Sequence, residues 1–192
     1  MMIVALVLAA GQGRRFGTDK RRAGLEGSTL LARSVERALE AFGEVRVILR
    51  VGERAEDFGL PAGCRVIHSP DAALGMGHSL AAGAASLCDS DARAVAVLLG
   101  DMPWIAPSTL RQLADAASAS TILFPLYDGQ RGHPVLFGRD FWPRLADLRG
   151  DEGARAVVAV HRERCVSLQV DDAGVLRDVD TPEALLRWAA RA

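Results

Sequence analysis

The 192-residue sequence predicts an α/β fold with a mostly parallel central sheet. The first observation is a set of short aliphatic and β-branched runs with little polar alternation, at 3–10, 45–51, 65–69 and 94–100. Such continuous apolar runs are typical of parallel strands that are covered on both faces. The second observation is that helical patterns lie between these runs, which favours right-handed strand–helix–strand crossovers.

The segments that follow the first, third and fourth strands read as helices. Apolar residues recur at spacings of three and four along 28–42, at Leu31, Val35, Ala38 and Phe42. Ser28 is the expected N-cap of this helix, and Gly43 is its expected stop. Two further helices are expected at 77–87 and 107–117.

The second half of the chain is less regular. Strands are expected at 121–127 and 133–137, a helix at 153–161, and a final strand pair at 165–170 and 175–179. The last helix covers 181–190, with Thr181 as N-cap and Pro182 at the first helical position. No repeat or linker is visible in the sequence, so we expect a single domain over residues 1–192, long enough for one core.

Composition and charge exclude several classes of protein. Hydrophobic residues make up 49% of the chain, which is ordinary for a globular protein and too high for a disordered one. Lys and Arg (23) nearly balance Asp and Glu (24), which argues against a surface built to bind nucleic acid. The widely spaced Cys64, Cys88 and Cys165 fit reduced thiols better than a zinc site. The apolar N-terminal run is shorter than the roughly 20 residues that a membrane span needs. We therefore expect a cytoplasmic protein that binds neither nucleic acid nor membrane.

The first strand leads into a glycine-rich basic loop, LAAGQGRRFGTDK, at residues 8–20. In α/β sheets, ligands bind at the carboxyl ends of the strands, and Gly11 and Gly13 would let main-chain N–H groups turn toward phosphate oxygens. Five cations follow within nine residues: Arg14, Arg15, Lys20, Arg21 and Arg22. These features indicate a phosphate site, with a solvated basic loop as the alternative. The spacing fits neither a P-loop, since Thr18 follows Gly17, nor a dinucleotide fingerprint, since no helix follows directly.

The whole loop resembles the signature LAAGxSxRMGxxK of nucleotidyltransferases of the molybdenum-cofactor type. It matches at Leu8, Ala9, Ala10, Gly11, Arg15, Gly17 and Lys20, and departs at Gly13 and Phe16, where the family often has Ser and Met. Further segments resemble the family in the same order: GMGHSL at 75–80, GDMPWI at 100–105, RGHPVLF at 131–137, GDEGAR at 150–155 and DVDTPE at 178–183. Together they span nearly the full chain. The resemblance implies a three-layer, Rossmann-like nucleotidyltransferase fold and the use of Mg²⁺.

Two aspartates are the expected metal ligands. Asp101 ends the fourth strand, so its carboxylate would project from the carboxyl edge of the sheet beside the first loop. A carboxylate there can hold Mg²⁺, which binds through one or two carboxylates plus substrate phosphates. A turn cap before Pro103 is the alternative role. The resemblance adds Asp180 as the second carboxylate, although it could instead cap the last helix if Thr181 does not.

The resemblance implies further roles. Arg15 and Lys20 would act with Asp101 as catalytic residues by stabilising charge on the phosphates. The nucleotide would be bound by Leu8, Ala9, Ala10, Gly11, Gly13, Arg14, Gly75, Gly77 and Ser79, the last reading a pyrimidine edge unless it merely begins a helix. The acceptor would be bound by Arg131, His133, Asp151 and Arg155. As alternatives, Gly132 would turn a hairpin and Asp151 would cap a helix near Gly153.

The sequence looks closest to the cytidylyl branch of this family, since Ala10 stands where a guanylyl branch tends to have glycine (LAGG). The expected reaction joins CTP to molybdopterin with release of pyrophosphate. Alternatives are a guanylyltransferase, a transferase for a sugar or alcohol phosphate, and an NAD(P)-dependent oxidoreductase. The last would need a glycine turn that enters a helix and an acidic or basic residue at the ribose about 20 residues later. Glu36 falls near that distance but lies on a polar helix face. A non-catalytic chaperone would leave the acidic motifs unexplained.

Small-molecule substrates are therefore expected for a monomer or weak dimer. A molybdenum-dependent oxidoreductase or its chaperone is the protein partner that the resemblance suggests.

Overall fold

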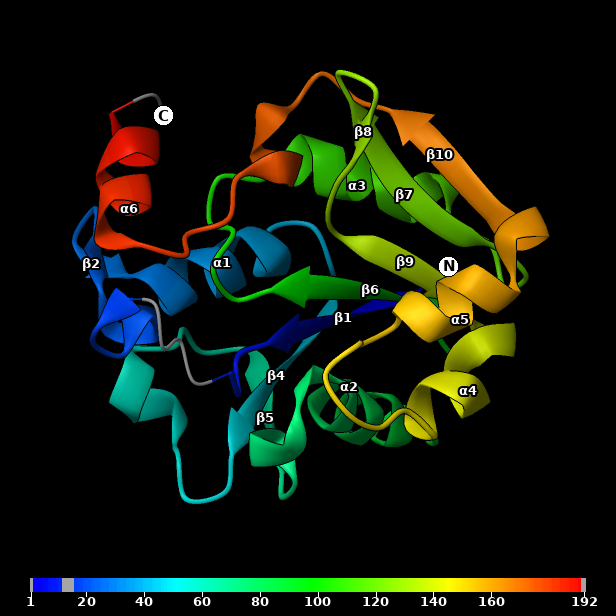
Figure 1. Ribbon diagram of the computed structural model, residues 1–192, viewed down its shortest axis with the longest axis horizontal. Coiled ribbons are helices and arrows are strands. Elements are labelled where there is room, and N and C mark those ends of the chain that lie inside the picture. Colours follow the sequence, from blue (N-terminus) through cyan, green and yellow to red (C-terminus); the bar gives the residue numbers. More distant parts are fainter. Residues whose placement is uncertain (1, 12–15, 191–192) are drawn as a thin grey trace.

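The computed structural model describes residues 2–11 and 16–190 and has a central sheet between two layers of helices (Figure 1). The strand order is β10-β7-β9-β6-β1-β4-β5, with β8 paired to β7. The strands are β1 (Ile3–Leu8), β4 (Glu44–Arg50), β5 (Cys64–Ser69), β6 (Ala94–Leu99), β7 (Ile122–Tyr127), β8 (Gln130–Arg131), β9 (Val135–Gly138) and β10 (Cys165–Gln169). β9 runs antiparallel to both β6 and β7, whereas the other neighbours along this path are parallel. The prediction of a mostly parallel sheet is confirmed.

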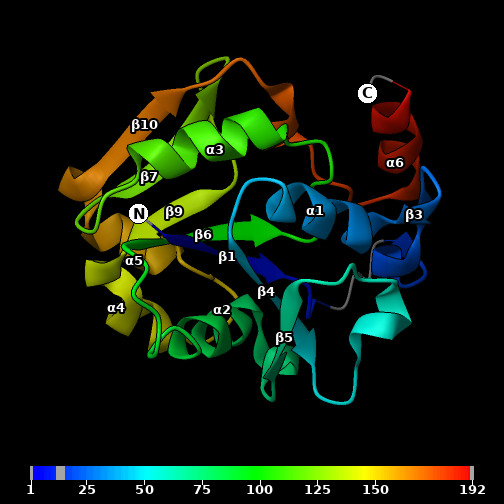
Figure 2. The same ribbon diagram turned by 180° about the vertical axis from the view of Figure 1, so that it is seen from behind.

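The helices are α1 (Leu30–Leu39), α2 (Met76–Ala85), α3 (Pro107–Ala116), α4 (Trp142–Ala146), α5 (Arg155–Val160) and α6 (Pro182–Ala189). α1 and α3 cover one face of the sheet (Figure 2), and α2, α4 and α5 pack on the other. In the part of the chain that the structure describes, no helix combines the length and the hydrophobicity needed to cross a membrane.

The central strand β1 shows why its sequence lacks polar alternation. Ile3, Ala5 and Val7 point to the layer of α1 and α3, while Val4 and Leu6 point to the layer of α2. All five side chains are at most 5% exposed. A strand covered on both faces has no solvent side, so apolar residues occupy every position.

The predicted strand at 175–179 is wrong. A short 3₁₀ helix (Ala173–Leu176) overlaps the start of this segment, and β10 pairs in parallel with β7 instead. Val175 and Val179 are fully buried, so the apolar pattern reported burial correctly. The backbone nevertheless curls, because the Asp172 carboxylate accepts hydrogen bonds from the N–H groups of Gly174 at 2.8 Å and Ala106 at 2.9 Å.

The predicted caps of the helices have mixed outcomes. α1 is capped by Thr29, whose Oγ1 accepts from the N–H of Ala32 at 3.1 Å, rather than by Ser28. Ser28 belongs to a small hairpin of β2 (Gly24–Leu25) and β3 (Ser28–Thr29), and α1 ends at Leu39, before Gly43. The prediction for α6 is confirmed, since Thr181 Oγ1 accepts from the N–H of Ala184 at 3.2 Å.

α6 is held by a small hydrophobic cluster separate from the two main core layers. Buried Leu25, Leu30 and Val179 form its centre, and Phe16, Ala23, Trp104, Leu185 and Trp188 pack against them. This C-terminal cluster fixes residues 178–180 beside the end of β6, where the main-chain N–H of Val179 donates to the carbonyl oxygen of Asp101 at 3.1 Å. The last part of the chain is thereby brought to the carboxyl edge of the sheet.

Candidate active site

A cavity of about 680 Å³ lies at the carboxyl ends of β1 and β6. Loops from five parts of the chain enclose it: those after β1, after β5 and after β6, the turn before α5, and the segment before α6. Eleven of the residues assigned from the sequence line it: Leu8, Ala9, Ala10, Gly11, Lys20, Gly75, Ser79, Asp101, Asp151, Arg155 and Asp180. Gly13, Arg14 and Arg15 lie outside the described residues.

The pairing of β1 with β6 places the first loop beside Asp101. Leu8 and Leu99 are register partners at the ends of these parallel strands, and the N–H of Gly100 donates to the carbonyl of Leu8 at 3.0 Å. A Cβ at Gly100 would lie 2.7 Å from a methyl carbon of Leu31, so a larger residue would push the strand end away from α1. Glycine at this position therefore lets Asp101 enter the cavity directly after the strand.

Lys20 joins the two aspartates that the sequence assigns to a metal. Its Nζ donates to Asp101 Oδ2 at 2.6 Å, to the carbonyl of Val179 at 2.9 Å and to Asp180 Oδ1 at 3.2 Å. The side chains of Lys20 and Asp101 are only 16% and 18% exposed. Three segments that are far apart in sequence thus converge on one ammonium group.

The charges at this point shift each other's pKa. Burial raises the pKa of Asp101 above its ordinary value, the nearby Asp178 and Asp180 add to the rise, and Lys20 opposes it. Burial alone would lower the pKa of Lys20, but the two aspartates outweigh it and raise the pKa. Asp101 Oδ1 is buried and has no hydrogen-bond partner among the described residues. Among the described residues, three carboxyl groups, those of Asp101, Asp178 and Asp180, therefore gather near the Lys20 ammonium.

Arg21 and Arg50 anchor the glycine-rich loop rather than facing a phosphate. Arg21 is 6% exposed; it donates to the carbonyl of Ala9 at 2.7 Å and pairs with Asp19 and Glu53 at 2.7 and 2.6 Å. Arg50 donates to the carbonyls of Ala10 (2.9 Å) and Gly11. The sequence counted Arg21 as a loop cation, but its charge is committed to two carboxylates. Its partner Glu53 follows β4, and no local pattern links that residue to the loop.

The segments 75–79 and 149–155 pack closely to form one wall of the cavity. The N–H of Gly77 donates to the carbonyl of Gly150 at 2.8 Å, and a Cβ at Gly77 would lie 2.8 Å from the carbonyl oxygen of Arg149. Gly77 therefore supports this wall without lining the cavity. Asp151 does not cap α5, whose N-cap is Ala154 with no side-chain cap, and instead faces the cavity with Arg155.

Arg131 and His133 lie outside the cavity lining. Arg131 is stacked over the ring of Phe124 at 4.7 Å, and Gly132 packs against the backbone of Val175 instead of forming the hairpin turn, which lies at Asp128 and Gly129. Burial lowers the pKa of His133, while the charges of Asp101 and Asp178 oppose the shift. Of the four residues that the sequence assigns to the acceptor, Asp151 and Arg155 line the cavity, and Arg131 and His133 do not.

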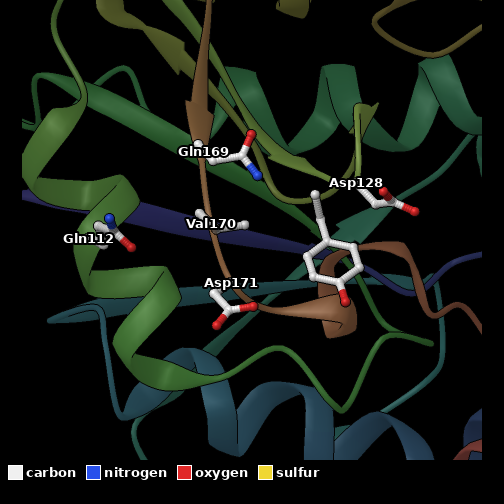
Figure 3. A pocket seen from close by; sticks show the side chains of 6 residues that line it. Gln112, Asp128, Gln169, Val170 and Asp171 are labelled. Carbon is white, nitrogen blue, oxygen red and sulfur yellow. The ribbon is translucent and has the colours of Figure 1, made fainter.

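A second cavity, of about 840 Å³, lies where β7 and β10 end beside α3 (Figure 3). Gln112, Tyr127, Asp128, Gln169, Val170 and Asp171 line it. Two carboxylates and no cation among these described residues suit phosphates poorly, so the first cavity is the better nucleotide site.

Comparisons with known proteins identify the family to which the chain belongs. Residues 5–166 match the family model of the MobA-like NTP transferase domain. The purine catabolism protein PucB of Bacillus subtilis (strain 168) is 29% identical over 94% of this chain and 93% of its own length. The molybdenum cofactor cytidylyltransferase of Escherichia coli (strain K12) is 26% identical over 94% of this chain and 92% of its own.

Among solved structures, Rv0371c of Mycobacterium tuberculosis H37Rv, in complex with manganese, superposes with a TM-score of 0.84 at 29% identity over the full length of both chains. A nucleotidyl transferase from Methanothermobacter thermautotroptrophicus superposes with a TM-score of 0.82 at 24% identity over 99% of this chain and 97% of its own, which confirms the predicted fold. Since the family model spans most of the sequence, the chain belongs to the family of MobA-like NTP transferase domains.

Proposed function

We propose that this protein transfers a cytidylyl group from CTP to the terminal phosphate of molybdopterin and releases pyrophosphate. The observation that carries the proposal is the convergence of Lys20, Asp101 and Asp180 at one side of a cavity large enough for a nucleotide. The E. coli cytidylyltransferase, similar along nearly its whole length, supports the choice of acceptor. The Ala9-Ala10-Gly11 sequence, which lines the cavity, supports CTP over GTP.

Mg²⁺ is the cation we propose for Asp101 and Asp180. The donors fit, because Mg²⁺ is usually held by one or two carboxylates together with substrate phosphates. Asp101 Oδ1, buried and without a partner among the described residues, is an oxygen that a cation would satisfy. A bound divalent cation would neutralise charge on the phosphate oxygens. The manganese complex of the M. tuberculosis relative supports a divalent ion.

The chemistry we propose is an in-line displacement at the α-phosphorus of CTP. An oxygen of the acceptor phosphate forms the new bond to phosphorus, and the bond to the bridging oxygen of pyrophosphate breaks. A phosphate monoester has a second pKa of about 6, so the attacking oxygen is largely ionised at neutral pH and needs no general base. Catalysis then depends on positioning and charge neutralisation.

Each group of residues has a part in this scheme. Lys20 and Arg15 stabilise charge on the α-phosphate and on the leaving pyrophosphate. The first loop, with Gly11, Gly13 and Arg14, holds the triphosphate, and the segment with Gly75, Gly77 and Ser79 holds the base. Asp151 and Arg155 line the cavity on the same wall as the segment 75–79 and would bind the acceptor. Arg131 and His133 are proposed as further contacts to the acceptor, although they do not line the cavity.

Nucleotide preference tests the proposal. With Mg²⁺ present, CTP should raise the melting temperature more than GTP, ATP or UTP at equal concentration, since stabilisation follows the ratio of ligand concentration to Kd. Pyrophosphate release from CTP should then depend on molybdopterin. A clear preference for GTP would instead make the protein a guanylyltransferase, and release with a sugar phosphate would replace the acceptor.

The proposal extends to location and partners. We propose a cytoplasmic monomer or weak dimer that acts on small molecules and delivers its product to a molybdenum-dependent oxidoreductase or to that enzyme's chaperone. Two experiments would test the delivery step. Deletion of this protein should leave a molybdenum enzyme without its cofactor, and a pull-down with this protein should recover that same enzyme.

A further inference from the structure

Lys20 is the only lysine in the sequence, which otherwise uses arginine, at 22 positions. The two side chains are not equivalent. An ammonium is a compact point charge with three donors, whereas a guanidinium is a planar fork suited to two parallel contacts. A chain that uses arginine everywhere else and lysine here points to a need for a compact cation at this position.

Oxygen atoms surround the Lys20 ammonium. Asp101 Oδ2, the carbonyl of Val179 and Asp180 Oδ1 accept from Nζ at 2.6, 2.9 and 3.2 Å. These three acceptors match the three N–H donors of an ammonium group. Carboxylate and carbonyl oxygens around a compact charge are also what a divalent cation such as Mg²⁺ or Mn²⁺ takes in proteins. The lysine thus stands in the kind of oxygen environment that the proposed metal needs.

In this arrangement Lys20 cannot take its proposed role at a phosphate, and Asp101 and Asp180 cannot take their proposed role as metal ligands. With its three donors used by protein oxygens, Lys20 has none for a phosphate, and Asp101 and Asp180 already hold a positive charge. We infer that Lys20 occupies the divalent-cation position in the ligand-free protein, and that metal and nucleotide bind cooperatively because the ammonium leaves the two carboxylates for the phosphates. The inference rests on the proposed metal role of Asp101 and Asp180 and not on the identity of the nucleotide.

Competition between the two cations has a definite thermodynamic form. Free metal must displace a paired ammonium on a mostly buried side chain, so it binds weakly on its own. A triphosphate that attracts Lys20 removes this competition, and linkage requires metal and triphosphate to strengthen each other by the same factor. The ligand-free site is thereby kept from loading with metal before a nucleotide arrives.

The single lysine allows a direct test on the unmodified chain. Protein labelled with ¹⁵N only at lysine gives one side-chain ammonium signal by NMR, and its hydrogen bonds should keep that signal sharp. Saturating Mg²⁺, and Mg²⁺ with CTP at lower metal concentration, should shift or broaden this signal. If calorimetry shows Mg²⁺ bound while the lysine signal is unchanged, the inference is wrong.

A pair of variants gives a second test that does not use catalysis. Mn²⁺ affinity measured by electron paramagnetic resonance without nucleotide should rise roughly tenfold in Lys20→Met, within the usual range of coupling between two sites. Arg22→Met is the matched control: its side chain is 57% exposed and lies 3.9 Å from Asp19, so its Mn²⁺ affinity should equal that of the unmodified chain. Equal or weaker Mn²⁺ binding by Lys20→Met would overturn the inference.

The two proposals fail differently. Tighter Mn²⁺ binding by Lys20→Met, without any turnover of CTP by the unmodified chain, would remove the cytidylyl proposal and keep the exchange of cations. CTP turnover by the unmodified chain, together with an unchanged Mn²⁺ affinity in Lys20→Met, would keep the cytidylyl proposal and remove the exchange of cations. If Lys20→Met does not fold, because two carboxylates are left facing each other, the NMR titration of the unmodified chain decides alone.

Discussion

The N–H of Val179 donates a hydrogen bond to the carbonyl oxygen of Asp101 at 3.1 Å. This contact joins the end of β6 to the segment before α6, and it sets the two proposed metal ligands, Asp101 and Asp180, on either side of one main-chain link. Lys20 closes the arrangement from the first loop. The proposed catalytic group therefore depends on backbone geometry as much as on the side chains.

Replacing Asp101 tests its proposed role. Asp101→Asn keeps the shape of the side chain but removes its charge, so turnover should fall on the order of 10²-fold or more. The melting temperature should change by no more than about 3 °C, which is about 1 kcal/mol for a chain of this size. Pyrophosphate release and thermal unfolding measure the two effects.

Asp178→Asn is the control for Asp101→Asn, because this exposed carboxylate lines the cavity without touching Lys20. The loss of turnover in Asp178→Asn should therefore be smaller. Near-normal turnover by Asp101→Asn would exclude the metal role.

The ion pairs of Arg21 predict a specific dependence of stability on pH. Burial alone would raise the pKa of Glu53, but Arg21 outweighs it, and the folded-state pKa lies below the ordinary value of 4.5. The folded state therefore holds its proton less tightly than the unfolded state, so this stabilisation is fully present above pH 4.5 and is lost as the pH falls through the lowered value.

Glu53→Gln should accordingly be about 2 kcal/mol less stable than the unmodified chain at pH 7, the size of a hydrogen bond to a charged group. The gap should narrow as the pH falls below 4.5 toward the folded-state value. Urea unfolding at a series of pH values measures it. A gap that stays constant down to pH 3 would show that Glu53 acts through packing and not through its charge.

Gly77 should tolerate no side chain. Gly77→Ala would place a Cβ 2.8 Å from the carbonyl oxygen of Arg149, so α2 and the turn before α5 must separate. Overpacking of this kind costs about 1–3 kcal/mol, and the displaced wall should also weaken nucleotide binding. Gly43→Ala is the control, because nothing lies within 4 Å of a Cβ there. Denaturant unfolding and a CTP titration distinguish the pair; equal stability would mean that the wall can adjust.

The two arginines proposed for the acceptor should differ in effect. Arg155 lines the cavity, whereas Arg131 is stacked on Phe124 outside it. Arg155→Ala should raise the KM for the acceptor on the order of 10-fold, as expected for the loss of a charged hydrogen bond. Arg131→Ala should change it less. Steady-state kinetics with varied molybdopterin measure both, and the opposite order would place the acceptor on the Arg131 side.

The fold could be predicted from the sequence because strands that are buried on both faces, such as β1, β4 and β6, consist of nearly continuous runs of apolar residues. The error at 175–179 has the same origin. Val175 and Val179 are as buried as strand residues, but Val175 packs into the core layer of α1 and α3, and Val179 packs into the cluster that holds α6. Apolar patterns report that a residue is buried and not which backbone pairs with it. The N-cap of α1 was misplaced by one residue because Ser28 and Thr29 carry equivalent hydroxyl groups.

The residues of the candidate site could be predicted from the sequence, but the contacts between their side chains could not. The loop and the two aspartates were found from local motifs, and the structure brings them together. The ion pairs of Arg21 with Asp19 and Glu53, and of Lys20 with the two aspartates proposed to hold a metal, depend on side chains that meet only in three dimensions. Sequence spacing carries no signal for such pairings.

The burial of Lys20 also determines how susceptible the folded protein is to cleavage after lysine. An endoprotease that cleaves after lysine has a single target in this chain, and that target is held by three acceptors in the folded state. Cutting therefore requires the loop to detach locally, and the cleavage rate reports how often it does so. Digestion with such a protease, with and without ligand, therefore measures how often the first loop opens in each state.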